Sequence, residues 1–146
     1  MRNEFSKSRI VLDTKPLIKL FAKEEGWVTI QKILEYVEDG EIEAALSVVT
    51  LTEIYYKYLR EKRADLAKIR IEDLRHAVYI RKLEVNEEVA VKAGEFKGKY
   101  NVPIADAFIA ANAYFDNSTV ISDDEDFKKI AEVKSLTEKE FLSRLG

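Results

Sequence analysis

Residues 101–129 read NVPIADAFIAANAYFDNSTVISDDEDFKK and join an apolar segment, a short strand-like segment and an acidic cluster. The segment 102–117 is apolar on most helical faces and has Pro103 where a first helical turn tolerates proline, so it predicts a helix. The segment 118–122, STVIS, predicts a strand that ends at the acids. A strongly apolar helix that leads into a short strand is typical of an α/β protein, in which helices cover the sheet.

The rest of the chain repeats this alternation of helices and strands. Strands are predicted at 8–13, 42–49, 82–86, 118–122 and, at the sheet edge, 133–136. Helices are predicted at 14–26, 27–40, 50–63, 65–81, 87–100, 102–117, 125–132 and 137–145. This order predicts a mainly parallel central sheet with helices on both faces, which is a three-layer α/β/α fold. We expect one domain over residues 8–146 and a loose tail at 1–7.

Composition limits the possible functions. Of the 146 residues 47% are apolar, enough for a core, and the net charge of −3 with mixed signs leaves no overall nucleic-acid footprint. An anionic substrate therefore needs a local basic patch or bridging cations. The absence of cysteine excludes disulfides and thiolate metal sites and fits a cytoplasmic location. No apolar run reaches membrane-spanning length, so we expect no membrane partner.

The chain contains a single histidine, His76. The presence of only one histidine excludes chemistry that needs two imidazoles and argues against a histidine-rich zinc site. Because it lies in the helical pattern EDLRHAVYI, we expect a structural role at the surface or in a partly buried position.

Four acids follow predicted strands. Asp13 ends the first strand, and Glu53 lies in the first turn of the predicted helix after the second strand. Asp106 lies in the first turn of the helix opened by Pro103, and Asp124 follows the fourth strand. Since sites in parallel α/β sheets lie beyond the carboxyl ends of the strands, all four side chains can project from the same edge.

Helix capping offers a simpler explanation for some of these acids. Thr50 and Glu53 have the spacing of a capping box, and so do Ser122 and Glu125. Acids in a first turn also complement the helix dipole. For Glu53, capping and chemistry are equally good explanations, and at least two of the acids at 123–126 are expected in a solvated turn.

Capping does not account for Asp106, whose neighbours are apolar. No Arg or Lys occurs between Val102 and Asp126, and a buried carboxylate needs a partner. Asp13 at its strand end raises the same question. A bound divalent cation answers it, and oxygen ligands without Cys or His favour Mg²⁺ or Mn²⁺ over Zn²⁺. The usual chemistry of such a site is phosphoryl transfer, in which the ion activates a water and neutralises charge on the phosphate.

Four segments, in order along the chain, resemble the motifs of the PIN-domain family of metal-dependent ribonucleases, and the resemblance as a whole extends from about Ser8 to Phe141. They are IVLDTKPLIKLF, SVVTLTEIYYKY, AGEFKGKYNVPIADAFIAANA and TVISDDEDF. Each segment alone is a weak signal, whereas four in order at suitable spacing are a strong one. The resemblance implies that four acids are catalytic and bind the metal: Asp13, Glu53, Asp106 and Asp124.

The resemblance also implies roles for neighbouring side chains. Asp126 would support the metal site from the side, and the hydroxyls of Thr14 and Ser122 would orient carboxylates or water. One mild departure from the family pattern is Lys15-Pro16 after the Asp-Thr pair, where small or apolar residues are commoner.

The size of the chain is similar to that of VapC-type toxins from toxin–antitoxin pairs. This resemblance implies a Mg²⁺- or Mn²⁺-dependent endoribonuclease that hydrolyses RNA phosphodiester bonds, forms a homodimer and is inhibited by a small antitoxin protein. Two alternatives stay open. One is a free-standing RNA-processing nuclease of the same fold, and the other is a non-catalytic metal-binding module for signalling or interaction.

A basic stretch within residues 55–70 is the candidate RNA-binding surface. Its cations could meet phosphates while bases stack on interleaved tyrosines. For the tyrosines, packing in the core or a dimer interface is the favoured explanation. The candidate RNA-binding residues are Lys57, Arg60, Lys62 and Arg63.

Overall fold

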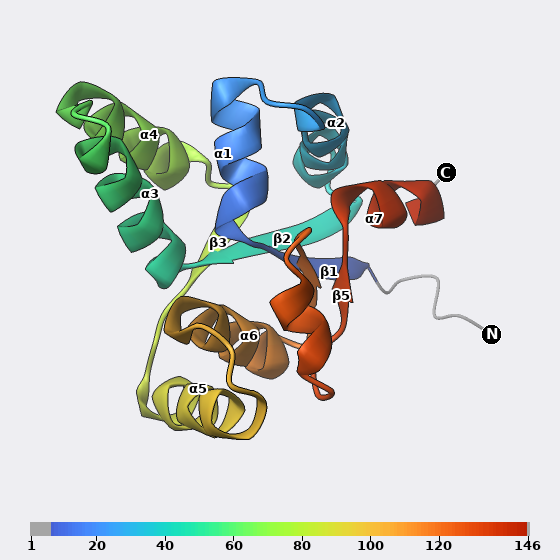
Figure 1. Ribbon diagram of the computed structural model, residues 1–146. Coiled ribbons are helices and arrows are strands. Elements are labelled where there is room, and N and C mark those ends of the chain that lie inside the picture. Colours follow the sequence, from blue (N-terminus) through green and yellow to red (C-terminus); the bar gives the residue numbers. More distant parts are fainter. Residues whose placement is uncertain (1–6, 146) are drawn as a thin grey trace.

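The computed structural model describes residues 7–145. The tail was predicted at residues 1–7, and residues 1–6 lie outside the described residues. Within 7–145, five parallel strands form one sheet in the order β3-β2-β1-β4-β5 (Figure 1). The strands are β1 (Ser8–Leu12), β2 (Ile42–Ser47), β3 (Ile80–Leu83), β4 (Thr119–Ile121) and β5 (Ser135–Leu136).

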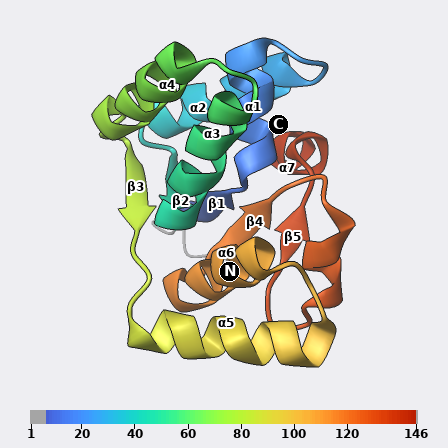
Figure 2. The same ribbon diagram turned by 60° about the vertical axis from the view of Figure 1, so that its left-hand side comes forward.

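Helices cover both faces of this sheet, as predicted. One face is covered by α1 (Thr14–Ala22), α2 (Trp27–Glu38), α3 (Val48–Arg60), α4 (Ala64–His76) and α7 (Glu138–Leu145). The other face is covered by α5 (Glu87–Tyr100), α6 (Ile104–Asp116) and the 3₁₀ turn η1 (Glu125–Lys129). Figure 2, turned by 60°, shows the same separation, with α5 and α6 below the sheet and α1 to α4 above it. The three-layer α/β/α prediction is therefore confirmed.

The alternation of side chains along the strands builds two cores. Ile10 and Leu12 of β1 pack into the core under α1 to α4 and α7, whereas Val11 between them packs into the core under α5 and α6. In β2, Leu46 packs into the first of these cores and Ala45 into the second. Strands buried on both faces explain why these segments read as continuous apolar runs rather than as alternating ones.

The second strand is shorter than predicted. The apolar run suggested a strand over 42–49, but β2 ends at Ser47 and α3 begins at Val48. The side chain of Ser47 accepts a hydrogen bond from the backbone N–H of Val49 at 3.1 Å, so Ser47 is the N-cap of α3. This cap outweighs the preference of the two valines for strands.

The third strand lies earlier in the chain than predicted. The helical pattern suggested a helix to residue 81 and a strand at 82–86, but α4 ends at His76 and β3 spans Ile80–Leu83. The register pairs Ala44 of β2 with Ile80, and it buries Ile80 in the core. Long-range pairing with β2 therefore sets the strand position, which local periodicity does not reveal.

The topology places the carboxyl ends of β1, β2 and β4 side by side, because β1 pairs with both of the other strands. The segments that leave these ends lead into α1, α3 and η1. Across residues 7–145, no helix is both long enough and apolar enough to cross a membrane.

Candidate active site

Asp13 lies at the centre of the sheet edge, between β1 and α1. Its carboxylate accepts a hydrogen bond from the backbone N–H of Thr14 at 2.8 Å and caps α1. The other carboxylate oxygen accepts a hydrogen bond from Ser122 Oγ at 2.7 Å. Ser122 directly follows β4, the neighbour of β1, so the pairing of two strands 109 residues apart in sequence brings these groups together.

Glu53 reaches the same edge from α3, but not as a capping residue. Because α3 begins at Val48, Glu53 lies in the second turn of the helix and Thr50 lies inside it, so the predicted capping box does not form. Instead, the Oε1 atom of Glu53 accepts a hydrogen bond from Thr14 Oγ1 at 2.5 Å. Glu53 is therefore held by a contact at the sheet edge and not by capping of α3.

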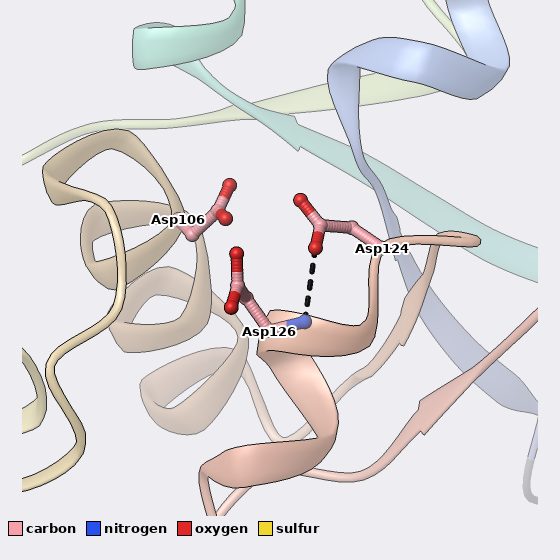
Figure 3. Close-up of side chains that lie close together, drawn as sticks. All are labelled: Asp106, Asp124 and Asp126. Carbon is pink, nitrogen blue, oxygen red and sulfur yellow. Dashed lines mark hydrogen bonds between the residues drawn. The ribbon is translucent and has the colours of Figure 1, made fainter.

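Asp106, Asp124 and Asp126 form a tight group of carboxylates. Asp106 is the third residue of α6, and Asp124 caps η1 by accepting a hydrogen bond from the backbone N–H of Asp126 at 2.9 Å. Oxygen atoms of the three side chains lie within 4.8 Å of one another. Figure 3 shows the three carboxylates gathered between the start of α6 and the start of η1.

The second predicted capping box is replaced by a different arrangement. Ser122 Oγ accepts a hydrogen bond from the backbone N–H of Asp124 at 2.9 Å while it donates to Asp13. Asp126 Oδ1 also accepts a hydrogen bond from Lys129 at 2.8 Å, so the charge of Asp126 is partly neutralised. Ser122 thus links the carboxylate on β1 to the loop that carries Asp124.

The four predicted catalytic acids open onto one cavity of about 530 Å³. Asp126, Lys62 and Arg63 do not line this cavity, although Asp126 lies beside Asp106 and Asp124. Arg63 instead pairs with Asp65. The lining residues are Asp13, Thr14, Lys15, Ile18, Glu53, Tyr56, Lys57, Arg60, Glu61, Asp106 and Asp124.

The acids at the cavity floor lack cationic partners within the described residues. Burial raises the pKa of Asp13 to about 6, although hydrogen bonds from Ser122 and Thr14 act to lower it. Burial, followed by the negative charges of Asp13 and Asp124, raises the pKa of Asp106 to about 8. No ion pair between described residues includes Asp13, Glu53, Asp106 or Asp124.

The order of strands and acids matches a known family. A family model described as the PIN domain matches residues 10–133. The chain belongs to the PIN-domain family. A search of curated proteins found no match to this PIN domain.

Solved structures share the fold of this PIN domain. VapBC2 from Rickettsia felis, bound to a DNA fragment from its promoter, has 16% identity and a TM-score of 0.73, covering 88% of this chain and 98% of that chain. FitAcB from Neisseria gonorrhoeae has 22% identity and a TM-score of 0.67, covering 89% of this chain and 98% of that chain. VapBC-5 from Mycobacterium tuberculosis, a member of the VapBC family of toxin–antitoxin systems, has 23% identity and a TM-score of 0.60, with the same coverage.

The donor set of this PIN domain fits a divalent cation. Asp106 is only 8% exposed and lies close to the carboxylates of Asp124 and Asp126, so its ionised form is unfavourable without a cation. Asp124 and Asp126 bring further carboxylate oxygens within reach, and Asp13 and Glu53 line the same cavity as Asp106. Hard oxygen donors without sulfur or nitrogen suit Mg²⁺ or Mn²⁺.

A lysine that the sequence analysis did not single out holds the loop that carries Asp124. Lys19 of α1 pairs with Asp123 in this loop and, at 3.0 Å, with Glu138 at the start of α7. Glu138 is buried, so the pair anchors α1 to α7 beneath the loop. The partners lie 104 and 119 residues from Lys19, and no local pattern marks such contacts.

The single histidine plays no part in the cavity. His76 is the last residue of α4, and its side chain is exposed. Its Nδ1 atom lies 2.8 Å from the backbone oxygen of Glu72. The surface position expected from the helical pattern is therefore confirmed.

Proposed function

We propose that this PIN domain is a Mg²⁺- or Mn²⁺-dependent endoribonuclease and the toxin component of a toxin–antitoxin pair. The observation that carries the proposal is the buried carboxyl of Asp106, which shares one cavity with three other acids and has no cationic partner among the described residues. Burial and the neighbouring acids raise the pKa of this carboxyl to about 8, so its ionised form is disfavoured unless a cation lies beside it. PIN-family membership supports a nuclease.

In this proposal Asp106, Asp124 and Asp126 would hold the ion, together with Asp13 and Glu53, which line the same cavity as Asp106 and Asp124. When bound, the ion would activate a water and offset the charge that develops on the phosphate. Ser122 and the Thr14 backbone hold Asp13 in one orientation through its two oxygens.

The Thr14 hydroxyl orients Glu53 in the same way. Its hydrogen bond uses Oε1 and leaves Oε2 of Glu53 to align a water or an RNA hydroxyl. The chain thus contributes fixed carboxylates, which need no rearrangement when the phosphate enters.

RNA is the proposed substrate because the cavity combines acids with cations at its rim. Lys15, Lys57 and Arg60 line the cavity beside the acids, although the chain as a whole is acidic. Lys57 pairs with Glu61, so Lys15 and Arg60, which make no ion pair within the described residues, supply the local positive charge that an anionic polymer requires. Lys62 and Arg63 do not line the cavity, so any contact that they make with RNA is remote from the acids.

An antitoxin is the proposed protein partner. The solved VapBC and FitAcB chains match this chain over nearly their whole length, which supports a toxin of this type. We propose that a small antitoxin inhibits this protein and that the active form is a homodimer. Expression of the wild type should arrest growth, whereas Asp106→Asn should not.

The test of the activity is an RNA cleavage assay with Mg²⁺, Mn²⁺ or EDTA. The wild type should cut unstructured RNA only with metal, and Asp106→Asn should cut at least about 100-fold more slowly. Asp116→Asn is the matched control, because Asp116 ends the same helix outside the cavity. Cutting in EDTA, or equal cutting by wild type and Asp106→Asn, would refute the proposal.

A further inference from the structure

The cavity has two chemically different sides. The floor consists of the four acids at the sheet edge, whereas one wall is formed by α1 and α3 and carries cations and an aromatic ring. The wall residues are Lys15, Ile18, Tyr56, Lys57, Arg60 and Glu61. A substrate that places a phosphate over the acids can therefore extend along this wall.

Helix α3 aligns the wall with the floor. Glu53, Tyr56 and Arg60 are three and four residues apart, so they share one face of the helix. At about 1.5 Å of rise per residue, Tyr56 lies about 4–5 Å and Arg60 about 10 Å along the axis from Glu53. This face leads from the acids toward the position of a nucleotide next to the scissile phosphate.

Tyr56 presents an exposed aromatic ring in this position, with the Arg60 guanidinium over one of its faces. Its side chain is 45% exposed, whereas Tyr58 on the same helix is 5% exposed and belongs to the core. The guanidinium of Arg60 lies 5.9 Å from the centroid of the Tyr56 ring. An exposed ring with a cation beside it is a surface on which a nucleobase can stack while its phosphate meets the charge.

Of the two cations next to Tyr56 on α3, Arg60 is the one available to a phosphate. Lys57 pairs with Glu61 and lies 4.7 Å from the centroid of the Tyr58 ring. Arg60 is exposed and makes no ion pair with any residue in the described range. The wall therefore offers one stacking ring and one free guanidinium, separated by a single helical turn.

We propose that Tyr56 and Arg60 form a nucleotide subsite, in which the base next to the scissile phosphate stacks on Tyr56 and its phosphate contacts Arg60. This inference rests on the proposed nuclease function. Stacking on an aromatic ring tolerates any base but requires an unpaired one. The subsite thus selects for an unpaired nucleotide beside the cut rather than for a particular base.

The test places 2-aminopurine at each position in turn of an unstructured RNA oligonucleotide and measures its fluorescence with Asp106→Asn protein, which leaves the RNA intact. Quenching should be strongest at one position, next to the bond that the wild type cuts. Adding Tyr56→Leu should abolish this quenching and weaken binding about tenfold, whereas Tyr56→Phe should stay within about twofold of the parent. Tyr79→Leu, at another half-exposed tyrosine that does not line the cavity, is the matched control.

Cleavage by the otherwise wild-type protein provides a second readout. Tyr56→Leu should raise KM about tenfold with little change in kcat, and Arg60→Gln should raise KM by a similar factor. Thermal unfolding should be unchanged, because the Tyr56 ring is not part of the core.

The outcomes separate this inference from the proposed function. If the wild type cuts RNA while Tyr56→Leu retains both the quenching and the wild-type KM, the subsite is refuted and the nuclease stands. If the wild type cuts no RNA, the proposed function fails, and quenching that depends on Tyr56 would still support the subsite. If the wild type cuts no RNA and the Asp106→Asn protein binds none, both are overturned.

Discussion

Helix α6 carries an aspartate near each end, and the protein treats the two in opposite ways. Asp116 ends the helix, where the dipole disfavours a negative charge. It receives hydrogen bonds from Arg81 at 2.7 and 2.9 Å and from Arg9 at 3.0 Å. Burial acts to raise the pKa of Asp116, but the hydrogen bonds from Arg81 and Ser118 hold it below its ordinary value.

Asp106 lies in the first turn of the same helix, where the dipole favours a negative charge. Its pKa is nevertheless raised to about 8 by burial and by the charges of Asp13 and Asp124. The protein supplies two arginines to one carboxylate and further acids to the other. The difference teaches that Asp116 contributes to the fold, and it supports the proposal that Asp106 serves a cation from outside the chain.

The largest expected effect is on stability, with opposite signs at the two ends of α6. Asp116→Asn should lower the free energy of unfolding by about 2 kcal/mol, because Arg81 loses its partner. Asp106→Asn should raise it by about 2 kcal/mol in metal-free protein near neutral pH, because a neutral amide replaces an acid with a raised pKa. Urea denaturation in EDTA measures both changes. A lower free energy of unfolding for Asp106→Asn would contradict the view that Asp106 lacks the charge compensation that Asp116 has.

A second test follows the pH dependence of stability in metal-free protein. The raised pKa values of Asp106 and Asp13 mean that the native state binds more protons than the unfolded chain between about pH 4 and pH 8. The free energy of unfolding should therefore fall as pH rises through this window. Asp116 acts in the opposite direction, because the stability from its lowered pKa is lost as pH falls below about 4.

Denaturation at a series of pH values checks these signs. The Asp106→Asn profile should be flatter than the wild-type profile between about pH 6 and pH 8, where Asp106 contributes more to the pH dependence than Asp13 does. Parallel profiles in this range would show that the carboxyl of Asp106 does not carry the raised pKa.

The smallest expected effect concerns the support of the acidic loop. Lys19→Met leaves the buried Glu138 beside Asp123 without a cation, so it should lower the free energy of unfolding by about 1 kcal/mol. Because Asp123 precedes Asp124, the affinity for Mn²⁺ should also fall about threefold. Lys19→Arg should retain both properties.

Lys32→Met on α2, at an exposed lysine without an ion pair in the described range, is the control for Lys19→Met. Thermal unfolding and Mn²⁺ titration measure the two effects. Equal Mn²⁺ affinity in the Lys19 and Lys32 variants would show that Lys19 supports the fold without positioning Asp124.

The sequence predicts the layers of the fold and the acids at the strand ends because both depend on local patterns. Apolar runs alternate with helical periodicity, and a carboxylate such as Asp13 directly after a strand lies at a known edge of a parallel sheet. The same patterns misplace the third strand, because its register is set by pairing with Ala44 rather than by its own residues. Local sequence patterns therefore predict the existence of helices and strands more accurately than the residues at which they begin.

Contacts between distant residues account for what the sequence could not predict. Glu53 had the spacing of a cap, yet its partner is Thr14, 39 residues away. The two arginines that neutralise Asp116 lie 107 and 35 residues from it, so sequence alone does not distinguish it from Asp106. The apolar neighbours of Asp106 gave the local hint of its different role, because the absence of Arg and Lys from 102–126 applies to Asp116 as well.

The most direct test of the central claim is a calorimetric titration of the wild type, Asp106→Asn and Asp116→Asn with Mn²⁺ at about pH 8. Wild type and Asp116→Asn should bind the ion with equal affinity, and Asp106→Asn at least about tenfold more weakly. Such a result would show that the uncompensated carboxylate of α6 serves a cation. No binding by the wild type, or equal binding by Asp106→Asn, would contradict the account.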